Sequence, residues 1–249
     1  MLKTLGIVDA CYQADPARAK AARRVGGKPV LEWVARRATE CEWLDGVIVL
    51  TTADYRNRFV RALTPPDVPV YVACGGDVLA CFAAALAEYP AESAVRIGAD
   101  FPFLDPVLLD RLVMAAELEP GLDYAAYQSK SGRPAVLLPA GVYAEWFRVE
   151  ALWRAARQAS APADRQNATH YLYCRPEQFS SRMIPVPGPI DREDVRLTVD
   201  IEEDWDHILA IFDALGPDGL DWQRIARLLD HQPALRRRMA AINRELAES

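Results

Sequence analysis

Two aspartates follow predicted strands and could hold a cation between them. The stretch AVRIGADFPFLDP begins as a buried strand and reaches Asp100. Asp105 and the proline after it open the next helix, so Asp100 is left without a structural role. The stretch VRLTVDIEED repeats this design, with a strand that runs into Asp200 before a helix. Because ligands bind at the carboxyl ends of strands in open α/β sheets, the pair predicts a divalent-cation site.

Two of the acidic residues also have a purely structural explanation. Asp200 could cap the helix that follows it, with Glu203 as its capping-box partner. Asp77 precedes the helix predicted over residues 78–88, where an aspartate is typical of an N-cap. Both explanations stay open beside a role in ligand binding.

Three further polar residues allow two interpretations each. Glu145 lies in a predicted strand and faces either solvent or a ligand. His170 belongs to no motif, and a lone histidine is typical of packing or of the surface as well as of acid–base chemistry. His207 lies on the helix after Asp200, where we expect it at the surface.

Strands alternate with helices along the first half of the chain, which predicts an α/β fold. The sheet should be mostly parallel, with helices on both faces. Strands are expected at residues 5–8, 46–52, 68–72 and 94–97, and helices at 55–63, 78–88 and 106–117. From residue 122 shorter strands are expected at 124–127, 135–138 and 141–147, an antiparallel extension over about 122–150. The chain is read as one domain, 1–249, that ends in a helical tail over about 220–249 with a break near Pro233.

Composition narrows the function classes. The chain has 249 residues, 51% of them hydrophobic, so it can bury a large core. Its formal net charge is -6, which argues against a nucleic-acid surface. The five cysteines form no CxxC pair, and their odd number argues against a disulfide framework. No apolar run is long enough for a membrane span, and we expect a cytoplasmic protein.

Six segments occur in an order that is typical of one family. They are GGKPVLEW (26–33), GGDVLACF (75–82), VRIGADFPFLDP, residues 141–147 with their G-x-x-x-E-x-F spacing, RLTVDIEEDWDHI, and LLDHQPALRRRMAAIN. Together they resemble the cytidylyltransferases that activate acidic sugars, and within them the SpsF-like spore-coat polysaccharide proteins. The resemblance covers nearly the whole chain.

The resemblance implies a nucleotide-diphospho-sugar transferase fold, three layers around a mostly parallel sheet. It implies an enzyme that transfers CMP from CTP to a sugar acid or related sugar and releases pyrophosphate, in a homodimer. Asp100 and Asp200 match the acids that bind Mg²⁺, and Lys20 matches the lysine of the phosphate loop. The expected nucleotide contacts are Ala10, Arg18, Lys20, Asp77 and Asp100. The expected contacts on the sugar side are Glu145, Asn167 and His170.

The first loop, DACYQADPARAK, keeps the length of the family's phosphate loop but not its chemistry. Cys11, Ala14, Pro16 and Ala19 replace an arginine, a serine, a second arginine and a glycine, and Cys81 replaces the arginine of the D-V-L-x-R segment. Losing one bidentate arginine contact to a phosphate costs roughly 1–3 kcal/mol. Arg18, Lys20, Arg23 and Arg24 could compensate from shifted positions.

Three functions therefore remain open. The first is an active nucleotidyltransferase. The second is a degenerate, inactive member that binds a ligand or a partner, which the altered loop favours. The third is a glycosyltransferase on the same fold; it ranks last because Asp100-Phe101-Pro102 lacks the D-x-D pair usual there.

Overall fold

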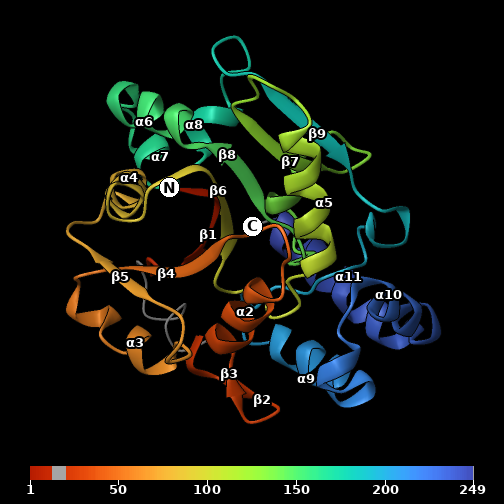
Figure 1. The fold of residues 1–249 in the computed structure, drawn as a ribbon. Coiled ribbons are helices and arrows are strands. Elements are labelled where there is room, and N and C mark those ends of the chain that lie inside the picture. The colour runs from red at the N-terminus through yellow and green to blue at the C-terminus, as the bar shows by residue number, and fades with distance from the viewer. Residues whose placement is uncertain (13–20, 249) are drawn as a thin grey trace.

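A seven-stranded sheet forms the centre of the computed structural model, which describes residues 1–12 and 21–248 (Figure 1). From edge to edge its strands are β5 (Val70–Ala73), β4 (Gly46–Thr52), β1 (Leu2–Asp9), β6 (Ala91–Gly98), β8 (Glu145–Arg148), β7 (Tyr124–Gln128) and β9 (Ser181–Pro185). Strand β8 pairs antiparallel with both of its neighbours, and every other pairing in this sheet is parallel. The predicted fold class, a mostly parallel α/β sheet, is confirmed. A separate short hairpin joins β2 (Arg24–Val25) to β3 (Lys28–Pro29).

Helices cover both faces of the sheet and give three layers (Figure 1). One core packs α4 (Val78–Glu88), α6 (Val149–Gln158) and α8 (His170–Tyr173) on the sheet, with α7 (Pro162–Arg165) beside α4. The other core holds α2 (Val30–Thr39), α5 (Pro106–Glu117), α9 (Asp204–Leu215), α10 (Trp222–His231) and α11 (Pro233–Glu248). Successive strand residues alternate between the cores, since Ile7 faces the first and Val8 the second.

The helix that follows Asp100 begins as predicted. The Asp105 carboxylate accepts the backbone N–H of Leu108 at 3.1 Å, which caps α5. Its other oxygen accepts the N–H of Trp222 at 2.9 Å and so ties the start of α10 to α5. This double use of Asp105 leaves Asp100 free for another role.

Several predicted elements differ in the structure. Residues 135–138 form a 3₁₀ turn, η2 (Ala135–Leu137), instead of a strand, and the strand expected at 141–147 is only β8. The helix expected at 55–63 is divided into η1 (Tyr55–Asn57) and α3 (Val60–Leu63). The strand expected before Asp200 is absent from the described chain, because residues 197 and 198 both donate to the Pro139 carbonyl instead of pairing along a strand.

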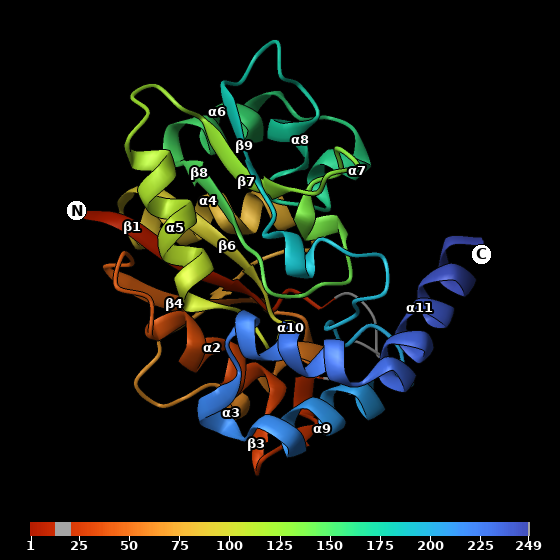
Figure 2. The same cartoon turned by 90° about the vertical axis from the view of Figure 1, so that its right-hand side faces the viewer.

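In Figure 2, α9 and α10 lie in the lower half of the molecule, and α11 rises along the right-hand side to the C-terminus. Helix α10 ends before Pro233, at the predicted break. Within the described residues, none of the helices is both long and apolar enough to cross a bilayer.

His207 is buried in α9, so the expectation that it lies at the surface is wrong. Neither ring nitrogen has a hydrogen-bond partner among the described residues. Burial lowers the pKa of His207 despite the nearby Asp204 and Asp206 carboxylates, and the Arg238 and Arg196 guanidiniums lower it further. The imidazole is therefore neutral in the folded protein.

We expect His207→Leu to flatten the fall in stability on acidification. Since the pKa is lower in the folded than in the unfolded state, the unfolded chain binds the proton first and stability falls as pH drops through the usual histidine range. Melting temperatures measured between pH 7.5 and pH 5 should therefore fall less for His207→Leu than for the unmodified protein. The control is His231→Gln at an exposed histidine, and equal slopes for all three proteins would contradict the account.

Candidate active site

Two adjoining clefts open at the carboxyl ends of β1 and β6. The first has a volume of about 430 Å³ and the second of about 340 Å³. Arg96, Asp100 and Asp200 line both, so they stand where the clefts meet. Tyr12 and Ala21, which flank residues 13–20, line the first cleft. The carboxyl edge of the sheet is where a parallel α/β fold binds ligands.

Gly98 makes room for the Asp100 carboxylate. A Cβ at this position would lie 2.8 Å from Asp100 Oδ1 and 2.8 Å from the Phe101 ring. Burial raises the pKa of Asp100 to about 6, and the negative charge of Asp200 adds to this. The two carboxylates are thus close enough to repel each other, and a bound cation would relieve that repulsion.

Asp200 is held beside Asp100 by backbone contacts. The N–H of Val199 donates to the Asp100 carbonyl at 3.2 Å, and that of Leu197 donates to the Pro139 carbonyl at 2.6 Å. Gly141, at φ +60°, allows this approach, since a Cβ there would lie 2.9 Å from the Leu197 carbonyl. These backbone contacts bring together Asp100 and Asp200, which lie far apart in the sequence.

The Asp200 side chain does not cap α9. Its carboxylate accepts the Thr198 hydroxyl at 2.6 Å and Arg196 Nη2 at 3.1 Å, and 42% of the side chain is exposed. Asp204 accepts the backbone N–H groups of Asp200 and Ile201 instead, at 2.8 and 3.0 Å. The capping alternative for Asp200 is therefore wrong, and its carboxylate faces the clefts.

A buried ion pair supports this segment. Arg196 donates from Nε to Asp204 Oδ1 at 2.5 Å and from Nη2 to Oδ2 at 2.9 Å. Arg196 is 3% exposed and Asp204 is fully buried. Because the same guanidinium also reaches Asp200, the pair positions that carboxylate as well as stabilising the fold.

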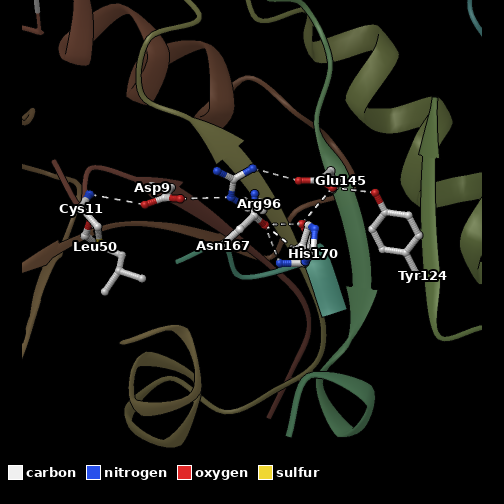
Figure 3. Close-up of polar contacts among 9 residues, drawn as sticks. Asp9, Cys11, Leu50, Arg96, Tyr124, Glu145, Asn167 and His170 are labelled. Atoms are coloured by element: carbon white, nitrogen blue, oxygen red, sulfur yellow. Dashed lines mark hydrogen bonds and ion pairs between the residues drawn. The ribbon is translucent and has the colours of Figure 1, made fainter. Parts of the chain in front are cut away.

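Arg96 lies between two carboxylates (Figure 3). Its Nε donates to Asp9 at 3.0 Å and its Nη1 to Glu145 at 2.9 Å. Glu145 is buried and also accepts the hydroxyls of Tyr124 at 2.6 Å and Thr169 at 2.9 Å. Burial acts to lower the pKa of Arg96, but Asp9 and Glu145 outweigh it and raise the pKa. The guanidinium is therefore charged and already paired.

The structure separates the two residues expected on the sugar side beside Glu145. Asn167 lines the second cleft, and its Oδ1 accepts the backbone N–H groups of Thr169 and His170 at 2.9 and 3.1 Å. His170 lines neither cleft, and its Nδ1 lies 2.6 Å from Asp164 Oδ1. Asn167 is thus placed to meet a ligand, whereas the His170 imidazole is held against Asp164.

The expected nucleotide contacts are divided in a similar way. Asp77 caps α4 by accepting the Ala80 N–H at 2.9 Å and pairs with Arg165 at 3.0 Å. Ala10 is buried, with its N–H on the Leu50 carbonyl and its carbonyl on the Thr51 hydroxyl. Neither Asp77 nor Ala10 lines the first cleft. Arg18 and Lys20 lie outside the described residues, as do Ala14, Pro16 and Ala19.

Two cysteines meet where the resemblance places arginines. The Cys11 thiol donates to the Leu50 carbonyl at 3.9 Å, and the Cys81 thiol donates to the Gly75 carbonyl at 3.8 Å. The neighbouring Cys81 thiol, burial and the nearby Asp9 carboxylate raise the pKa of Cys11. Cys11 also lines the first cleft. At these two positions a pair of thiols therefore stands in place of two guanidiniums.

We expect Asp100→Asn to stabilise the metal-free protein at pH 8 by about 1–3 kcal/mol. The Asp100 pKa is higher in the folded state than in the unfolded state, so the folded chain binds the proton more strongly. Stability therefore falls as pH rises from about 4 to about 6 and stays at the lower level above that. Urea unfolding with a chelator present should show the gain at pH 8 and none near pH 4. A loss of stability at pH 8 would contradict this account.

Sequence reasoning missed Asp9, Arg96 and Arg196. Asp9 ends the first buried strand, as Asp100 follows its own, and this position was the available signal. Arg96 and Arg196 are arginines inside apolar segments, where a charge needs a buried partner.

Comparison with known proteins places the chain in a family. The sequence profile of the MobA-like NTP transferase domain matches residues 16–180 of the 249. The chain belongs to the MobA-like NTP transferase family. The match includes β6 and β8, which carry Arg96 and Glu145, and ends before Asp200.

Two curated relatives of this MobA-like NTP transferase are similar in sequence. The uncharacterized protein MJ1063 of Methanocaldococcus jannaschii is 27% identical over 236 residues, 94% of this chain and 93% of the relative. The spore coat polysaccharide biosynthesis protein SpsF of Bacillus subtilis is 27% identical over 142 residues, 56% of this chain and 55% of SpsF. The resemblance to SpsF-like proteins is confirmed.

Solved structures share the fold. A cytidylyltransferase from Leptospira borgpetersenii superposes with a TM-score of 0.81 at 19% identity, over 94% of this chain and 95% of that one. A CMP:2-keto-3-deoxy-manno-octonic acid synthetase complexed with CTP gives a TM-score of 0.61 at 14% identity, over 85% and 99% of the two chains. The nucleotidyltransferase fold is thereby shown for this MobA-like NTP transferase.

Proposed function

We propose that the protein transfers CMP from CTP to a hydroxyl group of a sugar-like acceptor and releases pyrophosphate, with Mg²⁺ as the cation. The observation that carries the proposal is the Asp100–Asp200 pair at the junction of two clefts. A transferase needs one site for the donor and one for the acceptor, with the reacting atoms between them.

The first cleft suits the nucleotide. Tyr12 and Ala21 line it, and between them in the sequence stand Arg18, Lys20 and a single acid, Asp15. We propose that these two basic residues offer positive charge to the triphosphate. The buried Tyr12 hydroxyl has no partner among the described residues and lines the same cleft. A ligand group there would satisfy it.

The carboxylate pair fits Mg²⁺. No cluster of three or more metal-binding side chains occurs in the described part of the chain. Magnesium commonly takes one or two carboxylates and completes its shell with water and phosphate oxygens. Asp100 and Asp200 would hold the ion, which when bound supplies charge for the α-phosphate and the leaving pyrophosphate.

The second cleft would orient the acceptor. The acceptor hydroxyl would meet the α-phosphate beside Asp100 and Asp200. A P–O bond to the acceptor would form as the bond to pyrophosphate breaks, and the hydroxyl proton would pass to water in the cleft. Thr198 and Arg196 fix Asp200 in this position through bonds of 2.6 and 3.1 Å. Preorganised positioning of this kind provides much of the rate enhancement in phosphoryl-type transfers.

The proposal that cytosine is the base rests on similarity to known proteins. SpsF-like proteins carry the sequence resemblance, and the solved structures with the same fold include cytidylyltransferases. The second candidate function is that of a ligand-binding member without catalysis. The cysteines at positions 11 and 81 favour it, because no guanidinium stands at either position.

Pyrophosphate release tests the proposal. The protein would be incubated with Mg²⁺, one of CTP, UTP, ATP or GTP, and a set of hexoses, amino sugars and sugar acids. The proposal predicts release with CTP that depends on an acceptor, and a product with the mass of the acceptor plus a cytidylyl group. Tight CTP binding without turnover would support the non-catalytic candidate instead.

A further inference from the structure

We infer that the second cleft selects a neutral or amino-bearing sugar and excludes a sugar acid. This inference rests on the proposed function, since it assigns the acceptor of that reaction. The charges around the cleft favour such an acceptor, whereas the resemblance implies a sugar acid or a related sugar.

Carboxylates outnumber cations around the second cleft. Among the residues that the structure describes, five carboxylates line or directly back it: Asp9, Asp100, Glu145, Asp200 and Asp204. Two guanidiniums stand against them, those of Arg96 and Arg196. A bound Mg²⁺ on Asp100 and Asp200 would still leave the negative charges in excess.

Both guanidiniums are already paired on two sides. Arg96 lies between Asp9 and Glu145, and Arg196 lies between Asp200 and Asp204. Among the described residues that line this cleft, no cation is without a carboxylate partner. A carboxylate on the acceptor would therefore find no unpaired positive charge among these lining residues, and it would face like charges in a partly buried site.

The rest of the lining suits an uncharged ring. The Asn167 side chain and the carboxylates can bond to hydroxyl or ammonium groups. Val136, Leu137 and Phe101 contribute apolar surface for the C–H face of a sugar. An ammonium group gains further, because it would lie among carboxylates in excess.

Three matched sugars test the inference: glucose, glucosamine and glucuronic acid. They share one ring, while glucosamine carries an ammonium group and glucuronic acid a carboxylate. Binding would be measured by ligand-observed NMR with Mg²⁺ and a non-hydrolysable CTP analogue, and turnover by pyrophosphate release. We expect glucosamine or glucose to exceed glucuronic acid by about a hundredfold in affinity or in kcat/KM.

A charge-removing variant makes the test specific. Glu145→Gln keeps the side-chain shape but removes one of the two charges that neutralise Arg96. The ratio of affinity or kcat/KM for glucose or glucosamine over that for glucuronic acid should therefore fall by about tenfold or more. Asp9→Asn removes the other charge and provides the same test should Glu145→Gln not fold. A rise in this ratio in the folded variant would overturn the inference.

The outcomes separate the inference from the proposed function. Binding of the CTP analogue together with a preference for glucuronic acid would overturn the inference and leave the nucleotidyltransferase intact. Analogue binding with no binding of glucose or glucosamine would also overturn it. Failure to bind any nucleotide would overturn the proposed function itself, and that readout does not depend on the sugars.

Discussion

Asp100→Asn and Asp200→Asn are each expected to reduce nucleotidyl transfer by roughly a thousandfold, because each removes half of the proposed cation site. Both substitutions keep the side-chain shape and take away the charge. Asp100 lies at the meeting point of the two clefts, and Asp200 is held there by Thr198 and Arg196. Initial rates of pyrophosphate release at saturating Mg²⁺ measure the effect.

The matched control for this loss is Asp213→Asn. Asp213 is exposed on α9 and lines neither cleft, so its removal should leave the rate within a factor of two. Asp100→Asn should also be more stable than the unmodified protein at pH 8, which separates lost chemistry from lost folding. Near-normal rates in both cleft variants would show that the carboxylate pair does not take part in the reaction.

Asp204→Ala is expected to lower the free energy of unfolding by about 3–5 kcal/mol, since it leaves the Arg196 charge buried without its main partner. Arg196 donates to Asp204 at 2.5 and 2.9 Å, and both residues are almost fully buried. The substitution also removes the acceptor for the backbone N–H groups of Asp200 and Ile201. Urea unfolding monitored by tryptophan fluorescence measures the loss.

A neighbouring ion pair supplies the comparison. Asp206, on the same helix, pairs with Arg238 at 3.3 Å with 65% of its side chain exposed. Asp206→Ala should therefore cost less than about 1 kcal/mol. Similar losses in the free energy of unfolding for Asp204→Ala and Asp206→Ala would contradict this prediction. They would mean that burial does not determine how much the Arg196–Asp204 pair contributes to stability.

Local signals in the sequence were sufficient to predict the sheet and the position of Asp100 after a strand. Strands with buried residues on both faces, separated by helices, predicted the parallel core, and the structure has α4 and α5 at the predicted bounds. Asp100 was singled out because Asp105 already accounts for the helix cap. Both predictions depend only on residues that are close together in the sequence, so they could be made without the structure.

Contacts between distant segments were not available from the sequence. Asp9 lies beside Arg96 because β1 pairs with β6, and pairing register follows from tertiary structure. The segment before Asp200 has the apolar pattern of a strand, but its N–H groups bond to Pro139 instead. His207 resembled a surface residue because nothing local indicates that α9 buries that side.

Calorimetric titration of CTP with and without Mg²⁺, against UTP, ATP and GTP, tests the central claim most directly. The account predicts micromolar binding of CTP that requires Mg²⁺ and is lost in Asp100→Asn and Asp200→Asn. Two results would contradict this claim: no binding of any nucleotide, or binding that is unchanged by Mg²⁺ and by both substitutions. Absence of nucleotide binding would mean that the clefts serve another ligand.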